Sequence, residues 1–226
     1  MGAKDQCCYR EQLAFSFYSI FREPKLFRMA VRGDWNRIPS RCRSHPREAS
    51  FRHKYPPNET TLHVLLKPCL PCEDKRGLDL SETCLIEAVQ ALLGVSRQHA
   101  ATTDALGRTA LHVACSFGAS SKLLRLLVEA SPPTVSQVDV EGRTPLHYVL
   151  AQSPVINTSV LRLLVEAGPV ALSIKDSDGE TPIDIAQRRV SELVNAREVL
   201  ECLGVVPDDH TVKPRRPRVL TTSGES

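Results

Sequence analysis

The chain of 226 residues contains no apolar run that reaches the roughly 18 residues needed for a membrane-spanning helix. Its longest candidate, residues 13–21, is interrupted by serines and lacks the basic flank and cleavage site of a secretory signal. We therefore expect a cytoplasmic protein, with the nucleus as an alternative location.

Aromatic residues make up only 5% of the chain, and its eight cysteines follow no repeating frame. Small secreted proteins that depend on disulfides usually space their cysteines regularly, so we expect reduced thiols here. The hydrophobic content of 42% is enough to bury a core. The composition therefore indicates a folded chain that does not rely on disulfides.

The motifs of common enzymes are also missing. The sequence has no nucleophile motif, no phosphate-binding glycine loop and no arrangement of paired carboxylates for acid–base chemistry. Its best-placed glycines, Gly107, Gly142 and Gly179, belong to repeated turns. We therefore expect a protein that is not an enzyme and that uses no cofactor.

A repeated segment is the clearest positive feature of the sequence. Asp104 to His112 reads DALGRTALH, Asp139 to His147 reads DVEGRTPLH, and Asp176 to Asp184 reads DSDGETPID. Downstream, the heptapeptide LRLLVEA occurs twice, at residues 124–130 and 161–167. Self-similarity at a period of 35 to 37 residues indicates an array of small structural units that stack on one another.

Local chemistry predicts the structure of each unit. Aspartate and glycine favour a tight turn, and the threonines Thr109, Thr144 and Thr181 suit the N-cap of a following helix. Pro145 and Pro182 then occupy the first helical position, where a missing N–H group costs nothing. The first helix is too short to be stable alone, so it must pack against a second, leucine-rich helix and against its neighbours.

This pattern resembles the ankyrin repeat, and the resemblance is clearest over residues 104–206. Two less regular copies precede it: residues 58–66 carry Thr60 at the capping position without a turn glycine, and residues 26–38 place two helices around Gly33. The resemblance implies an all-α solenoid of stacked helix pairs joined by hairpin-like loops, with about five repeats. We expect an N-terminal arm or cap at 1–21, repeats at 22–54, 55–103, 104–138, 139–175 and 176–206, and a disordered basic tail at 207–226.

The links between these repeats depart from the family pattern. Residues 131–139 read SPPTVSQVD and residues 168–176 read GPVALSIKD, where the family usually has a glycine-alanine-asparagine ending. We therefore expect links that are longer and less regular than in most ankyrin proteins.

One histidine per repeat, His63, His112 and His147, occupies the third position of a predicted helix. Residues separated by a full repeat are not spaced for a shared metal site, so we interpret them as a structural ladder. In this ladder each ring bonds to the capping threonine or to the adjacent turn.

A second set of possible ligands lies in the insertion between the two helices of the second repeat. Cys69 and Cys72 form a CxxC pair, with Cys84 and His63 as the nearest further candidates for a zinc site. One CxxC pair supplies only two of four ligands, so we favour ordinary loop cysteines and keep zinc as an alternative.

The N-terminal residues offer an alternative of another kind. Gly2 could be myristoylated and the adjacent Cys7 and Cys8 could be palmitoylated, although position six carries Gln6 in place of the usual serine or threonine. We favour an unmodified N-terminus, with peripheral membrane contact as the alternative.

By resemblance, the protein is an adaptor or scaffold that binds another protein and is monomeric alone. The residues that the repeat does not need for turn, cap or core should make the contacts, at the turn tips and in the concave groove beside the first helices. Phe117 is an interface candidate that could equally pack into the next repeat. The full set of candidates is Leu106, Arg108, Phe117, Glu141, Arg143, Gln152, Asp178, Glu180, Arg188 and Arg189.

Charge supports a competing hypothesis. Residues 22–66 hold ten Lys or Arg against four Asp or Glu, although the whole chain has a net charge of only +3. The first repeat could therefore bind nucleic acid or an anionic membrane, and the scarcity of aromatics for base stacking (Trp35, Phe51 and Tyr55) makes nucleic acid the less favoured partner. The arginines concerned are Arg28, Arg32, Arg37, Arg41, Arg43, Arg47 and Arg52.

Overall fold

The computed structural model describes residues 23–53, 58–67 and 82–205. Its regular elements within these ranges are α-helices and short 3-10 helices, with isolated β-bridges that pair Arg52 with Thr60 and Thr103 with Thr109. The predicted all-α repeat solenoid is therefore confirmed.

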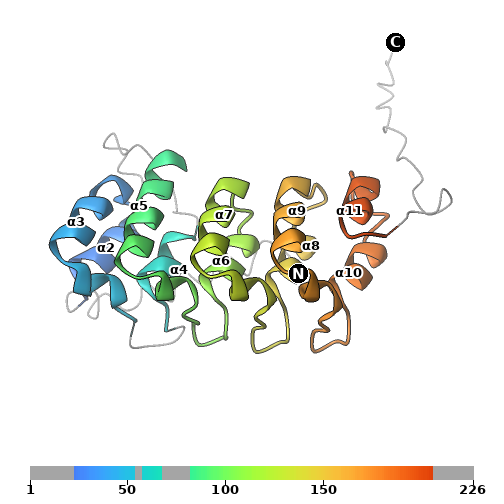
Figure 1. The fold of residues 1–226 in the computed structure, drawn as a ribbon, viewed down its shortest axis with the longest axis horizontal. Coiled ribbons are helices and arrows are strands. Elements are labelled where there is room, and N and C mark those ends of the chain that lie inside the picture. The colour runs from blue at the N-terminus through green and yellow to red at the C-terminus, as the bar shows by residue number, and fades with distance from the viewer. Residues whose placement is uncertain (1–22, 54–57, 68–81, 206–226) are drawn as a thin grey trace, which may run out of the picture.

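Helices follow one another in pairs, and Figure 1 shows the pairs stacked side by side with the inter-repeat turns projecting from one edge. First helices pack on first helices and second helices on second helices, so we name the two rows the inner and the outer layer. The inner and outer members of each pair are α2 (Lys25–Arg32) and α3 (Ile38–Ser44), α4 (Thr61–Leu65) and α5 (Glu82–Val95), α6 (Ala110–Ser116) and α7 (Ser121–Ala130), α8 (Pro145–Gln152) and α9 (Thr158–Ala167), and α10 (Pro182–Arg188) and α11 (Ala196–Cys202).

The inner helices begin where the threonines predict. The side chain of Thr109 accepts from the backbone N–H of His112, and Thr181 does the same for Asp184. In the first pair, where no such threonine exists, α2 ends at Gly33 with φ of +80°, a left-handed conformation that glycine adopts at little cost. A 3-10 helix, η2 (Trp35–Arg37), then leads into α3.

Three of the links between repeats share one backbone conformation. In each a proline opens the 3-10 helix, and the residue before it has a similar backbone conformation, with φ of −140° at His45, −151° at Ser131 and −156° at Gly168. Proline fixes its own φ and restricts the residue before it, so the same dipeptide chemistry produces the same bend each time. The links contain η3 (Pro46–Ser50), η4 (Arg97–Ala100), η5 (Pro132–Ser136) and η6 (Pro169–Ser173).

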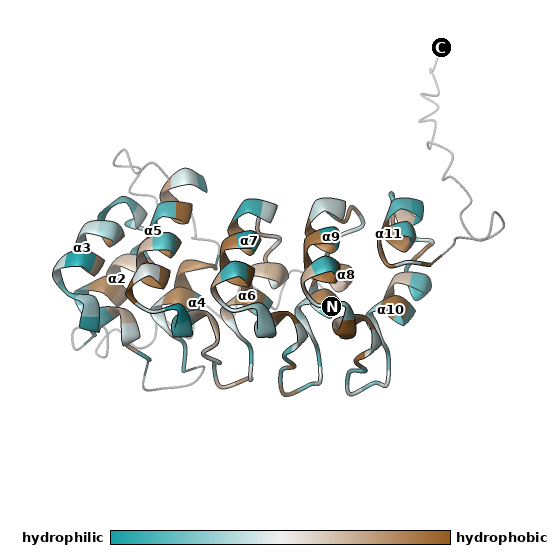
Figure 2. Cartoon of the chain, viewed as in Figure 1, coloured by the Kyte–Doolittle hydropathy of each residue, from teal (hydrophilic) through white to brown (hydrophobic). Residues whose placement is uncertain are grey.

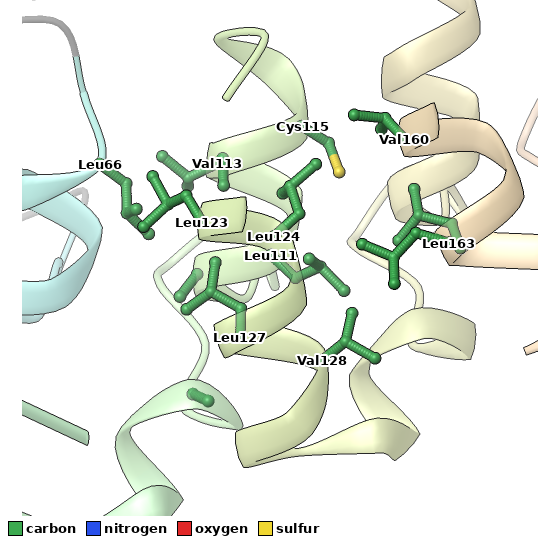
Figure 3. Close-up of a cluster of buried hydrophobic side chains, with 14 of the residues drawn as sticks. Leu66, Leu111, Val113, Cys115, Leu123, Leu124, Leu127, Val128, Val160 and Leu163 are labelled. Carbon is green, nitrogen blue, oxygen red and sulfur yellow. The ribbon is translucent and has the colours of Figure 1, made fainter. Parts of the chain in front are cut away.

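The core runs through the whole array between the two layers. Leu92, Leu127 and Leu164, each twelve residues before a turn aspartate, are completely buried, which confirms the register read from the sequence. Figure 3 shows how side chains of neighbouring repeats meet around α6 and α7, with Leu127 among them and Val160 on the facing α9.

The first repeat places an arginine at this leucine position. Arg41 lies twelve residues before His53. The backbone N–H of His53 donates to Glu59 O at 2.8 Å, just as the backbone N–H of each turn aspartate donates to a carbonyl oxygen of its own turn. The Arg41 guanidinium is bound by Glu48, with 3.1 Å between Nε and Oε2, and the same carboxylate accepts from Leu26 N at 2.9 Å. An ion pair therefore replaces apolar packing in the first repeat, and it holds the pKa of Glu48 below its usual value despite partial burial.

Candidate partner-binding surface

Each of the three clear inter-repeat turns is built around one aspartate. Asp104 Oδ1 accepts from the backbone N–H groups of Leu106 and Arg108, both at 2.9 Å. Asp139 and Asp176 make the equivalent two bonds at 2.9 to 3.0 Å. The carboxylates are therefore committed to shaping the turns, as their sequence pattern indicated.

The turn before α4 reaches a similar shape without glycine. Asn58, two residues before the capping Thr60, has φ of +58°, while Gly107 at the corresponding position of the next turn has φ of +72°. Asparagine is one of the few residues that tolerates this region, so it takes over the role of the missing glycine. Its position relative to Thr60 is the sequence signal that could have identified it.

Backbone hydrogen bonds connect successive turns. Val140 N donates to Leu106 O at 3.0 Å, and Ser177 N donates to Glu141 O at 2.8 Å. The tips of the three turns therefore form one continuous row, in which each turn is hydrogen-bonded to the next.

Several of the predicted contact residues are exposed along this row. Leu106 is 40% exposed, its neighbour Val140 is 67% exposed, and Asp178 is also exposed. The exposed Glu141 binds Arg143 at 2.5 Å between Oε2 and the guanidinium, so this pair presents both signs of charge at the second tip. The tips thus combine apolar and charged groups, which suits a protein interface.

Arg108 does not project from the turn as a contact residue at its tip would. Its guanidinium folds back onto Asp104 Oδ2, at 2.9 Å from Nε and 2.7 Å from Nη2, and its side chain is only 15% exposed. Glu59, which is buried and paired with Lys67, lies 4.0 Å from the same guanidinium. Arg108 therefore balances a cluster of charges between the second and third repeats, because neighbouring carboxylates surround it.

Arg188 and Arg189 are adjacent in sequence but have different roles. Arg188 is 61% exposed and forms a two-bonded pair with Glu180, at 2.9 and 2.8 Å. Arg189 is only 13% exposed, and its guanidinium bonds to Leu150 O and to Ser153 O at the end of α8. The expectation that both line an open groove is wrong for Arg189, which joins two repeats.

Phe117 and Gln152 lie at the ends of inner helices, as predicted. Phe117 is half-buried and packs against the core, which supports the interpretation that it belongs to the array. Gln152 is exposed and lines a cavity of about 250 Å³ between the third and fourth repeats. The cavity wall is mainly apolar, with Leu124, Ile156 and Val160 among its residues.

The histidine ladder is present as predicted. His63, His112 and His147 each place Nδ1 within 2.9 Å of the hydroxyl of their own capping threonine. Each Nε2 lies 2.9 to 3.2 Å from a backbone carbonyl of the following turn. Because that carbonyl can only accept, Nε2 carries the proton. In His112 and His147, Nδ1 accepts from the N–H of the capping threonine, so these rings are neutral. Burial lowers the pKa of all three histidines, that of His112 to about 4.

The alternative metal and lipid sites fall largely outside the described residues. Cys69 and Cys72 are not described, and neither are Gly2, Cys7 and Cys8. Both ring nitrogens of His63 are engaged by Thr60 and Arg108, so His63 is not available as the zinc ligand considered above. Cys84 is half-buried on α5, and no group of three potential ligands is found within the described ranges.

Sequence reasoning missed the role of Tyr148. Its hydroxyl donates to Asp139 Oδ2 at 2.6 Å, and its ring meets His112 edge-on. Burial and the neighbouring carboxylate raise the pKa of this hydroxyl, so it stays a donor. Of the described repeats, only this one has an aromatic residue at this helix position. Comparing the repeats with one another therefore could not identify Tyr148 as important.

Comparison with known families agrees with this geometry. Residues 80–155 match the family model of ankyrin repeats (3 copies). No curated protein matches the chain. Among the helices of the described part, none is long and apolar enough to cross a membrane.

Proposed function

We propose, from the premise that this chain carries ankyrin repeats, that it binds a protein partner through its turn tips and the adjoining face of the inner helices. Ankyrin repeats are generally protein–protein interaction modules and are typically non-catalytic. The chain then acts as a binding protein that carries out no chemistry of its own.

The row of linked tips is the observation that carries this proposal. Leu106 and Val140 stand exposed on successive tips whose backbones are hydrogen-bonded to each other. A rigid surface loses little conformational entropy when it binds, and exposed apolar side chains gain burial against a partner. Scaffold stability explains the turn aspartates and capping threonines, but it does not require these apolar groups at the tips.

A double substitution, Leu106→Ser with Val140→Ser, tests the proposal. Both side chains are exposed, so the fold should remain intact while the apolar contact area is lost. The purified parent chain is used to capture proteins from an extract of its native cells. We expect the variant to fail to capture these proteins. Quantitative mass spectrometry of the captured proteins measures the effect, and circular dichroism checks the fold.

The matched control is Val170→Ser with Val194→Ser, which removes two exposed valines away from the tips. Proteins that disappear with the tip variant should persist with this control. Equal capture by both variants and the parent would place the recognition surface elsewhere. Arg108 is left unchanged in both variants, because a glutamate at this position would face Asp104 and Glu59 and would disturb the fold.

A further inference from the structure

The outer helix of the first repeat and the short helices on either side of it carry three exposed arginines. Arg37 precedes α3, Arg43 lies in its last turn and Arg47 lies in η3, and all three are exposed. None of the three forms an ion pair with another residue of the described ranges. In Figure 2 the side of α3 that faces the viewer is mainly hydrophilic. We call Arg37, Arg43 and Arg47 the basic face.

Structurally equivalent positions of later repeats carry different residues. Arg43 lies three residues before the proline of its link, where the third and fourth repeats have Glu129 and Glu166, both exposed. Arg47 directly follows that proline, where the later links have the uncharged Pro133 and Val170. The repeat scaffold itself does not require a positive charge at these places, because it forms with a negative or neutral residue there.

Two of the three acidic residues among residues 23–53 are engaged away from the basic face. Glu48 is held by Arg41 and Leu26 N. Glu23 lies 2.7 Å from the buried His53, and burial raises its pKa. The third, Asp34, is half-buried, and the three exposed arginines outnumber it, so they give this surface a positive potential.

We infer that the basic face docks an acidic segment of a protein partner. The inference rests on the proposed function, since an acidic segment is one kind of protein partner. Arginine suits this role because its planar guanidinium pairs with a carboxylate through two hydrogen bonds. The contact supplements the turn tips and widens the surface that a partner can engage.

Other polyanions fit the surface less well. A membrane-binding surface usually adds apolar side chains that enter the lipid, but none of the large exposed hydrophobics belongs to residues 23–53. Single-stranded nucleic acid needs exposed aromatics for stacking, whereas Trp35 is buried and Phe51 is half-buried with its ring against Phe27. Duplex DNA engages many phosphates, and α3, with seven residues, is only about 10 Å long.

The test uses the full chain and a fluorescent peptide of alternating Glu and Ser, about twelve residues long, at about 50 mM salt. We expect measurable binding by fluorescence anisotropy that weakens strongly at about 300 mM salt. Reversing the basic face with Arg37→Glu, Arg43→Glu and Arg47→Glu should weaken binding about tenfold or more. Circular dichroism confirms that the variant keeps its helices.

The control variant reverses three exposed basic residues of the later outer helices, Lys122→Glu, Arg125→Glu and Arg162→Glu. It changes the net charge of the chain by the same amount, so it should weaken binding by less than about twofold if position matters. Equal losses in the two variants, or no peptide binding at low salt, would overturn the inference.

Two further comparisons separate this inference from other outcomes. Binding of a short DNA duplex and of vesicles containing anionic lipid is measured in the same buffer. If the basic face binds either of them more tightly than the acidic peptide, the basic face is assigned to nucleic acid or to membrane instead. The capture experiment from the cell extract, repeated with the basic-face variant, distinguishes the proposed function from the inference about the basic face. Loss with the tip variant but not with the basic-face variant would sink this inference and leave the proposed function standing.

Discussion

Gly168 shows how closely adjacent links pack at the scale of single residues. A Cβ atom at this position would lie 2.8 Å from Val135 Cγ1 and 3.2 Å from Ser136 Oγ of the preceding link. Its φ of −156° is open to any residue, so the constraint is packing and not backbone strain. We expect Gly168→Ala to lower the free energy of unfolding by about 1 to 3 kcal/mol, measured by urea denaturation.

Gly94→Ala is the matched control for that experiment. Gly94 lies in α5, it is exposed, and nothing within 4 Å would meet its added Cβ. Alanine favours the helix over glycine, so this variant should gain up to about 1 kcal/mol. A loss in both variants would mean that the link contact is not the cause.

His112 links stability to pH at the same scale. Its pKa is lowered from 6.5 to about 4, mainly because the ring is buried. Below pH 6.5 the unfolded chain binds a proton that the folded chain excludes, so stability is full above pH 6.5 and falls toward pH 4. The fall for one such ring is on the order of 3 kcal/mol over this window.

His112→Gln should therefore reduce stability at pH 7, because the bonds to Thr109 and Arg143 O are altered. The same substitution should make the free energy of unfolding depend less on pH, because the titrating ring is removed. Urea denaturation at pH 7 and at pH 5 measures both effects. An unchanged slope in the His112 variant would mean that this ring is accessible to protons in the folded chain.

Contacts between elements depend on side chains that cross from one repeat to the next. Arg189, in the turn after α10, bonds to the carbonyls of Leu150 and Ser153 at the end of α8. We expect Arg189→Ala to cost about 1 to 2 kcal/mol, because two carbonyl groups lose a charged donor. The neighbouring Arg188→Ala breaks only an exposed pair with Glu180 and should cost less than about 0.5 kcal/mol in the same denaturation experiment.

The outer helices supply a second prediction at this scale. Leu127 on α7 and Leu164 on α9 are both completely buried at equivalent positions. Leu→Ala at either should cost about 2 to 5 kcal/mol, since each leaves a cavity as well as lost burial. Thermal unfolding measures this, and melting of both variants at the parent temperature would contradict the assigned register.

The whole chain includes a tail that the fold should not need. Residues 207–226 contain no apolar period that could dock on the array, and they lie outside the described residues. Truncation after Val206 should leave the helical signal and the melting temperature nearly unchanged. A large drop in melting temperature would show instead that the tail covers the last repeat.

Across the molecule, the sequence determined the parts that depend on local chemistry. Aspartate, glycine and the capping threonine specify each turn and helix start, because their bonds are made within a few residues of the chain. The ladder of His63, His112 and His147 and the buried leucines could be predicted as well, since repetition shows which positions serve the scaffold.

Only the tertiary structure decided where the long, flexible side chains go. Arg108 and Arg143 occupy the same place in two turns, yet Arg108 is held by Asp104 beside the buried Glu59 while Arg143 reaches the exposed Glu141. Arg189 likewise finds carbonyls that belong to another repeat, at Leu150 and Ser153. Repeat position fixes the direction in which such a side chain starts, but the charges and carbonyls of the neighbouring repeat determine where its guanidinium comes to rest.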